Sequence, residues 1–437
     1  MQRRCCVVLI GALASLAPLA GAELRAGAVR VSITPRTPIR LGGRDAVSAG
    51  VASQIYARAL ALDDGAGGRA VIITTDLMGL PRSLTERAAV EIMKAHTLER
   101  GQILFTATGT HNAPLIKGLQ PVLEPESGSE AKIIEQYAET LVHYLADAAG
   151  AAIGDLKPAR VDFAWGGAGL ESKNSKQAKQ PQGRDSQNVA VLRVLSPKGG
   201  LIAVLFGTST GNPVIGGGFR AIGGDAAGAA EAALEKEYKG SVALNLRLCG
   251  GSAAETAGSD EEAAERSAAD MAARVDQVLK GPMEQASGRL RSALIETALP
   301  FVAHTKEQFE QEAAGPDALA ARRGRRMLTA YEARNEPRQL PYPVQVVRFD
   351  QGFALVGLGG EVTAEVAGKI RKLLHYKEIV VSEDCNDGSA VVSGAAEPGE
   401  AEAQRMMEYG HPGPFTGEAE QRVLDAVQRA WKRTGRR

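Results

Sequence analysis

The sequence has 437 residues, of which 44% are hydrophobic and 23% charged, and its 51 Lys and Arg residues balance 51 Asp and Glu residues. This length and composition are typical of a globular protein with a large core. Without net charge the chain has no global field that would recruit nucleic acid or an acidic membrane. Aromatic residues make up only 4%, so few rings are present on which bases could stack. A nucleic-acid partner is therefore not expected.

The N-terminus has the features of a secretory signal peptide. Two arginines precede an apolar run over residues 5–19, and small residues follow at 20–22, which predicts cleavage before Glu23. The apolar run is shorter than the about 20 residues that span a bilayer, and no later segment has a membrane-spanning pattern. We therefore expect a signal peptide over 1–22 and one domain over 23–437 that is periplasmic or secreted.

Two cysteines, Cys249 and Cys385, remain after removal of the signal peptide. In an oxidising compartment a pair of cysteines permits one disulfide. The alternative is two buried thiols, and the sequence leaves both arrangements open.

Strand and helix patterns alternate along the rest of the chain. Strands or hairpins are predicted over 26–35, 56–62, 70–75, 102–106, 189–195, 201–206, 242–249, 344–358 and 378–382. Helices are predicted over 81–98, 131–152, 226–238, 261–279, 316–334, 361–375 and 417–432. This alternation indicates an α/β fold with mixed sheets flanked by helices. No internal repeat is visible in the sequence.

Three local features are predicted within this order. Ser83, with Glu86 three residues later, is expected to cap the helix over 81–98. Glu361 is expected at a helix start, where the helix dipole favours a carboxylate. The polar stretch over 171–187 has no periodicity and is expected to form a mobile surface loop.

The segment over 105–114, Phe-Thr-Ala-Thr-Gly-Thr-His-Asn-Ala-Pro, is the most informative part of the chain. It ends a predicted strand in small residues and places His111 just beyond the strand. Side chains at such strand ends are held by the sheet and exposed in a crevice, so this position is a candidate for chemistry.

This segment resembles the Ser-Ala-Thr-His-Thr-His-Ser-Gly-Pro motif of the neutral ceramidase family. Further stretches are similar to that family in the same order, among them Arg-Val-Ser-Ile-Thr-Pro at 30–35, Asp-Leu-Met-Gly-Leu at 76–80, Gly-Gly-Asp-Ala-Ala-Gly-Ala-Ala at 223–230 and Val-Gly-Leu-Gly-Gly-Glu at 356–361. The resemblance covers most of the mature chain. It implies the α/β catalytic domain of that family, without the family's C-terminal β-sandwich.

The resemblance also implies a zinc site. In that family two histidines, a glutamate and a tyrosine hold a zinc ion that activates water against the amide of an N-acyl sphingoid lipid. The four positions fall on Gly109, Gly211, Glu361 and Val391, or on Asn212 in place of Gly211 if the loop shifts by one residue. Only the glutamate is kept, and a single ligand does not hold catalytic zinc. We therefore expect no zinc cofactor and a pocket enlarged by small residues.

The polar residues that remain allow two interpretations. His111 with Asp225 or Glu361 would form a catalytic acid–base pair. Alternatively, these side chains are structural and hydrogen-bond the loop backbone. A serine nucleophile is not indicated, because the stretch at 208–210 lacks the Gly-x-Ser-x-Gly turn.

The sequence thus predicts an exported relative of the neutral ceramidases whose zinc ligands are mostly missing. The favoured hypothesis is a pseudoenzyme that binds a sphingolipid-like lipid or another amphiphilic small molecule. The first alternative is an active hydrolase of N-acyl amide or ester bonds that uses His111 with Asp225 or Glu361, or a metal held in some other way. The second alternative is a structural protein of the cell envelope.

Overall fold

The computed structural model describes residues 23–44, 46–166, 189–208, 214–216, 218–250, 257–259, 261–376, 378–394 and 399–435. The predicted signal peptide and the predicted loop over 171–187 lie outside these residues. No helix within them combines the length and the apolar character needed to cross a membrane.

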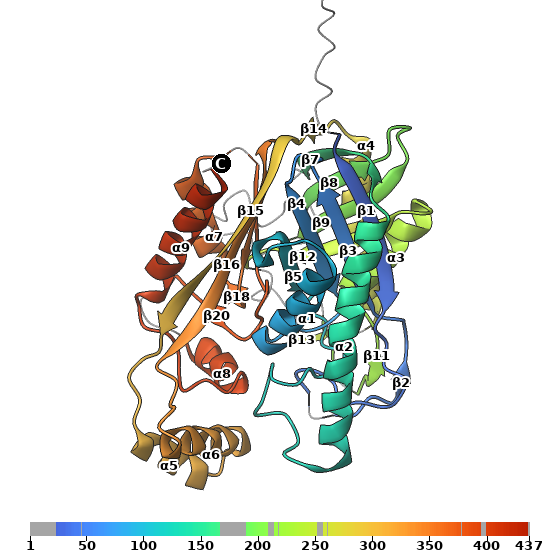
Figure 1. The fold of residues 1–437 in the computed structure, drawn as a ribbon. Coiled ribbons are helices and arrows are strands. Elements are labelled where there is room, and N and C mark those ends of the chain that lie inside the picture. Colours follow the sequence, from blue (N-terminus) through green and yellow to red (C-terminus); the bar gives the residue numbers. More distant parts are fainter. Residues whose placement is uncertain are drawn as a thin grey trace, which may run out of the picture.

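Most strands belong to three sheets (Figure 1). In spatial order, the first sheet consists of β5 (Ile103–Ala107), β4 (Arg69–Thr75), β3 (Tyr56–Asp63), β1 (Arg25–Ser32) and β6 (Lys157–Pro158). The second consists of β12 (Val242–Arg247), β9 (Leu201–Thr208), β8 (Val189–Leu195), β7 (Arg160–Gly166) and β14 (Glu284–Gln285). The third consists of β15 (Ser287–Pro300), β16 (Gln339–Gln351), β17 (Ala354–Leu358) and β19 (Ile379–Ser382).

The remaining strands form short parallel pairs, and helices lie between and after the strands. The pairs are β11 (Ala221–Ile222) with β2 (Gly50–Val51), β10 (Val214–Ile215) with β13 (Ala257–Ser259), and β18 (Glu361–Val362) with β20 (Val391–Val392). The α-helices are α1 (Arg82–Ala95), α2 (Gly128–Gly154), α3 (Asp225–Glu237), α4 (Glu261–Lys280), α5 (Lys306–Ala314), α6 (Ala318–Glu332), α7 (Ala364–Leu374), α8 (Glu400–Glu408) and α9 (Ala419–Thr434). Every strand and helix predicted from the sequence corresponds to one of these elements.

The three large sheets repeat one order of connection. In each, three successive antiparallel strands are followed by a helix and then by a strand that pairs in parallel with the third strand. The units are β1-β3-β4-α1-β5, β7-β8-β9-α3-β12 and β15-β16-β17-α7-β19, and each is followed by a further helix, α2, α4 or α9. The repeat is one of topology and is not visible as a repeated sequence, because many different apolar residues satisfy the same buried positions.

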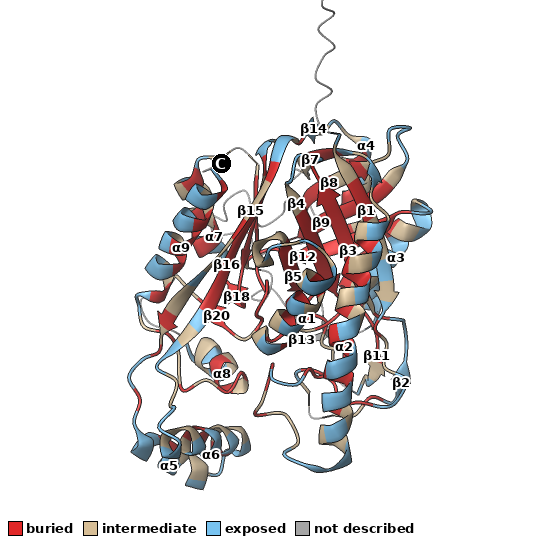
Figure 2. Cartoon of the chain, viewed as in Figure 1, coloured by how far each residue is buried: buried red, intermediate tan, exposed pale blue. Residues whose placement is uncertain are grey.

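One central core is shared by the three sheets. Its side chains include Leu60 and Ile72 from the first sheet, Phe163 and Leu244 from the second, and Phe349 from the third. The opposite faces of the sheets are covered by α1 and α2, by α3 and α4, and by α7 and α9. Central strands such as β4 and β9 are therefore buried on both faces (Figure 2), which explains their nearly continuous apolar sequences.

Two local predictions were wrong. Helix α1 is preceded by Pro81, whose carbonyl accepts the backbone N–H of Leu84 and of Thr85, and no side chain caps it. The expected Ser83 cap is absent because the fixed φ of proline places the cap at Pro81, two residues earlier. Glu361 does not open a helix: it lies in β18, paired with Val391, and α7 begins at Ala364.

A helical hairpin projects from the body of the molecule. Helices α5 and α6 connect β15 to β16, and they lie at the lower left of Figure 1, beyond the ends of these long strands. Thr305 caps α5 and Asp317 caps α6 with side-chain oxygens that accept backbone N–H groups. This confirms the predicted charged helix over 316–334, whereas β15, α5 and α8 were not predicted.

Candidate functional site

The site is built where the parallel strands of the three repeats end. Gly109 follows β5, Arg247 ends β12, and Glu383 and Asp384 follow β19. Arg247 Nε lies 3.2 Å from Glu383 Oε1, and its Nη1 lies 3.1 Å from Asp384 Oδ2. All three charged side chains are buried. Equivalent ends of three strands thus surround a single guanidinium group, in the way that carboxyl ends of parallel strands gather at one edge.

Gly109 stands directly against this guanidinium. Its φ is +80°, in the left-handed region that glycine adopts at low cost, and its N–H donates to the carbonyl of Leu77 at 3.0 Å. A Cβ atom added to Gly109 would lie 2.2 Å from Nη1 of Arg247. The guanidinium therefore fills the space that a side chain at position 109 would need.

Glu361 is held by two residues of the α8 region. The Tyr409 hydroxyl donates to Glu361 Oε1 at 2.9 Å, and Arg405 Nε lies 3.1 Å from Glu361 Oε2. Burial, together with the Glu361 carboxylate, raises the pKa of Tyr409 well above its usual value, so the phenol stays protonated and remains a donor. Val391 pairs with Glu361 between β20 and β18 and contributes a buried apolar side chain.

Asp225 and His111 lie together. The Asp225 carboxylate accepts the backbone N–H of His111 at 3.1 Å and that of Asn112 at 3.4 Å, and it also accepts the side-chain amide of Asn112. Burial raises the pKa of Asp225, although the Asn112 hydrogen bonds and the positive charges of His111 and Arg44 oppose this shift. These contacts fix the backbone after β5, which is the structural role considered above.

His111 and Glu361 both act electrostatically on Glu408. The pKa of Glu408 is raised mainly by burial; the Glu361 charge raises it further, and His111 and Arg405 lower it. The structure therefore gathers the three predicted residues, His111, Asp225 and Glu361, around one region. Their use as acid and base stays a prediction.

The residues at the family's zinc positions do not fit a zinc ion. Position 109 has no side chain, position 391 is valine, and the oxygens of Glu361 already face Tyr409 and Arg405. Gly211 and Asn212 lie outside the described residues. Guanidinium groups carry no lone pair for a metal and repel a divalent cation. Across the part of the chain that the structure describes, no group of three His, Cys, Asp or Glu side chains is placed to hold a metal ion.

Sequence reasoning missed Arg247, Arg405, Tyr409, Glu383 and Asp384. Arg247 had a signal, because it interrupts the apolar run Leu-Asn-Leu-Arg-Leu-Cys, and charged side chains are rarely buried unless paired. The acidic pair Glu-Asp directly after an apolar strand is the matching signal.

The two cysteines adjoin this site as free thiols. Cys249 and Cys385 are both buried and are not joined in a disulfide. Burial raises the pKa of Cys249 well above its usual value and that of Cys385 to about 12. Of the two arrangements left open by the sequence, the structure has the thiols, which are protonated and poor nucleophiles.

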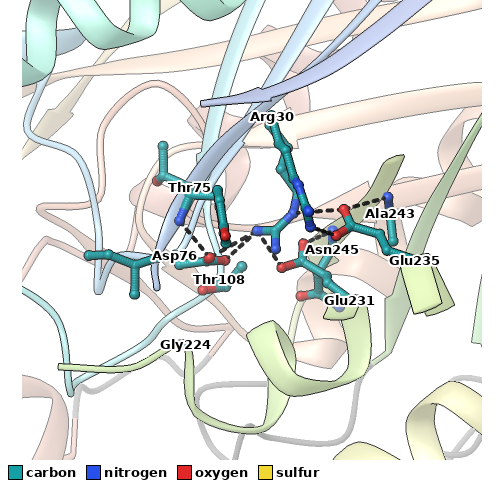
Figure 3. A network of polar contacts seen from close by, with 12 residues as sticks. Arg30, Thr75, Asp76, Thr108, Gly224, Glu231, Glu235, Ala243 and Asn245 are labelled. Atoms are coloured by element: carbon teal, nitrogen blue, oxygen red, sulfur yellow. Dashed lines mark hydrogen bonds and ion pairs between the residues drawn. The ribbon is translucent and has the colours of Figure 1, made fainter. Parts of the chain in front are cut away.

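A second buried ionic cluster lies behind the β4 end of the site (Figure 3). Arg58 Nη1 lies 2.8 Å from Asp76 Oδ1 and 2.6 Å from Glu231 Oε2, and Arg58 Nε lies 3.4 Å from Glu235 Oε1. Arg30 also pairs with Glu235. Burial raises the pKa of Glu231 well above its usual value, Arg58 opposes this shift, and the Asp76 carboxylate adds to it. Two guanidinium groups thus face three carboxyl groups; Arg58, Asp76 and Glu231 are buried, whereas Arg30 is exposed.

A groove lies beside the helical hairpin. It has a volume of about 900 Å³ and lies between α6, the loop at 118–126 and the turn that carries Tyr409, Gly410 and His411. Tyr409 lines this groove and also donates to Glu361, so one side chain separates the groove from the carboxylate of the site.

Comparison with solved protein structures gives several matches, among them two ceramidase structures. No protein-family profile and no curated protein sequence matches this chain. The crystal structure of neutral ceramidase from Pseudomonas aeruginosa matches with a TM-score of 0.72 at 16% sequence identity, over 94% of this chain and 75% of that chain. A structure of ceramidase complexed with C2 matches with a TM-score of 0.70 at 15% identity, again over 94% of this chain and 75% of the other.

Proposed function

We propose that this chain, which has the fold of neutral ceramidase, binds a lipid or another amphiphile and does not use the fold for zinc-dependent hydrolysis. The α/β fold predicted from the sequence resemblance is confirmed by these structural matches. The observation that carries the proposal is the position of Arg247, whose guanidinium occupies the side-chain space of position 109.

The electrostatics of the site support a binding role over a metal-dependent one. Arg247 pairs with both Glu383 and Asp384, and Arg405 pairs with Glu361. Positive charge is therefore supplied by fixed side chains, and among the described residues no group of side chains offers an open position for a catalytic metal. The ligand class follows from the ceramidase relatives and from the groove beside the site, because both suit a molecule with an apolar chain.

Metal analysis combined with an activity assay tests the proposal. After equilibration with excess zinc and removal of free metal, the purified mature protein is expected to retain far less than one zinc ion per chain. It is also expected to leave a short-chain N-acyl amide unhydrolysed and to carry lipid through purification, which mass spectrometry of a solvent extract would detect. Stoichiometric zinc together with hydrolysis of the amide would refute it.

A second candidate is a metal-independent hydrolase. It is favoured by the placement of His111 beside the buried Asp225, whose raised pKa suits a general acid. If amide or ester turnover is found without metal, His111→Ala is expected to abolish it. Turnover that survives His111→Ala and is lost after further purification would indicate a contaminant.

We also infer that the protein is exported, which rests on the signal-like N-terminus. N-terminal sequencing of protein recovered from the periplasm or medium is expected to begin at Glu23. Recovery only from the cytoplasm with Met1 retained would contradict this.

A further inference from the structure

We propose that the groove beside α6 binds a single-chain amphiphile with an oxyanion head, carboxylate or phosphate, and that Arg325 and Arg326 recognise that head. This inference rests on the proposed amphiphile binding and adds to it the chemical class and location of the head group. No residue of the central site is required for the argument.

One face of α6 forms the cationic side of the groove. Arg322, Arg325, Arg326 and Thr329 line it at intervals of three and four residues, which place them on the same side of a helix. The three arginines are exposed. Arg322 Nη1 donates to the carbonyl of Val122 at 3.1 Å, which ties α6 to the opposite wall.

The charged side chains that line the groove are three arginines and two glutamates, Glu124 and Glu126, which leaves an excess of one positive charge. Glu124 accepts the backbone N–H of Gly118, and burial raises its pKa while Arg326 opposes the shift. Burial lowers the pKa of His411 to about 4, so this imidazole is neutral at pH 7. The Glu124 carboxylate thus has a hydrogen-bond donor within its own loop, whereas Arg325 lines the groove as an exposed residue.

The inner surface of the groove is apolar and rigid. Phe301 and Met327 are buried, and Leu340 lies beside them. The ring of Phe301 stacks on Phe415 with centroids 5.1 Å apart and packs against His411 at 5.2 Å. A fixed apolar floor below a cationic rim matches a molecule with one charged end and one hydrocarbon chain.

Size and head-group chemistry narrow the ligand class. The volume of about 900 Å³ falls within the about 300–1,000 Å³ that is typical of sites for one small molecule, which favours a single chain. Arginine pairs with carboxylate and phosphate through two parallel hydrogen bonds, so adjacent guanidinium groups select an oxyanion over a neutral head.

A set of probes with one chain length tests the inference by calorimetry below their critical micelle concentrations. The probes are dodecanoate, dodecyl phosphate, neutral dodecanol and inorganic phosphate. The test variant is Arg325→Gln/Arg326→Gln. The control is Arg429→Gln/Arg433→Gln, which removes the same two positive charges from the exposed surface of α9.

Wild type and control are expected to bind at least one of the two anionic amphiphiles about tenfold or more tightly than dodecanol. The Arg325→Gln/Arg326→Gln variant is expected to lose this margin and to keep its affinity for dodecanol. The tighter of the two anions identifies the head as carboxylate or phosphate, and either result supports the inference. If the double variant has a lowered Tm, Arg325→Gln alone is used, because Arg325 is exposed on α6.

Three results would overturn the inference. The first is that dodecanol binds as tightly as both anions. The second is that the double variant binds the anions with the affinity of wild type. The third is that inorganic phosphate binds with the same affinity as dodecyl phosphate. In the first two cases amphiphile binding, and with it the proposed function, still stands. Failure of every amphiphile to bind would instead refute both.

Discussion

At Gly109, both the positive φ and the neighbouring Arg247 guanidinium disfavour any side chain. Gly109→Ala is expected to lower the free energy of unfolding by about 2–4 kcal/mol, because its φ of +80° strains alanine and its Cβ would press on Arg247. Gly199→Ala is the matched control, since Gly199 has φ +83° and open space around its Cβ position. It is expected to cost only about 1–2 kcal/mol. Urea unfolding of both variants measures the difference in stability. Equal losses in the free energy of unfolding would show that the Arg247 side chain moves away from the added Cβ at no cost.

Arg247 is the residue that pairs with both carboxylates of the buried acidic pair. Arg247→Met is expected to lower the free energy of unfolding by about 3–5 kcal/mol, because Glu383 and Asp384 would both lose a buried ion-pair partner. Arg422→Met removes an exposed arginine paired with Glu418 and is expected to cost about 0–1 kcal/mol. Chemical denaturation checks both values. A loss for Arg247→Met as small as that of the control would mean that the acidic pair finds water or another partner.

Helix α8 is the element that closes the site over Glu361. Tyr409→Phe removes the hydroxyl that donates to Glu361 and is expected to cost about 1–3 kcal/mol, because a buried carboxylate oxygen loses its partner. Gln404→Ala changes an exposed residue of the same helix and is expected to stay within about 0.5 kcal/mol of wild type. Thermal unfolding compares the two. Faster proteolysis of Tyr409→Phe near α8, relative to Gln404→Ala, would localise the effect to this element.

The elements that were predictable from sequence are those with a strong apolar pattern. The strands at 70–75 and 201–206 and the helix at 131–152 have such patterns, and each was found. β15 was not predicted, because it is an outer strand whose buried residues are spaced irregularly. α8 was not predicted, because only Met406 and Met407 of its nine residues are buried. Local sequence specifies an element only where the core imposes a regular period.

The candidate site was predictable only in part, for a physical reason. The absence of side chains at 109 and 391 and the presence of Glu361 could be read from motifs. The ion pair between Arg247 and Asp384 joins residues far apart in the chain, and their contact depends on how the second and third sheets meet. Apolar patterns in the sequence carry no information about how two sheets pack against each other. The ion pairs between residues of different sheets are therefore visible only in the structure.

At the scale of the whole molecule, the buried cluster around Arg58 couples stability to pH. The pKa of Glu231 is raised in the folded state, so above about 4.5, its ordinary value, the folded protein binds more protons than the unfolded chain. This contribution makes stability fall as pH rises toward the raised pKa. Glu231→Gln is expected to flatten the decline by up to about 1.4 kcal/mol per pH unit.

Urea unfolding at several pH values between about 5 and 8 measures that slope. Other buried carboxyl groups also titrate, so the informative quantity is the difference between variant and wild type. Glu237→Gln removes the same charge from the exposed face of α3, and its slope is expected to match wild type. A Glu231→Gln slope identical to wild type would show that this carboxyl group ionises freely inside the cluster.

The contact between Gly109 and Arg247 also bears on how such a site changes over generations. A histidine introduced at position 109 would collide with the guanidinium, and loss of the arginine first would remove an ion-pair partner from two buried carboxylates. Each single step therefore passes through a less stable protein than either end point. A site with histidine at position 109 and a site with Gly109 and Arg247 are therefore joined only through less stable intermediates. Positions 109 and 247, which belong to separate repeats, are expected to change together.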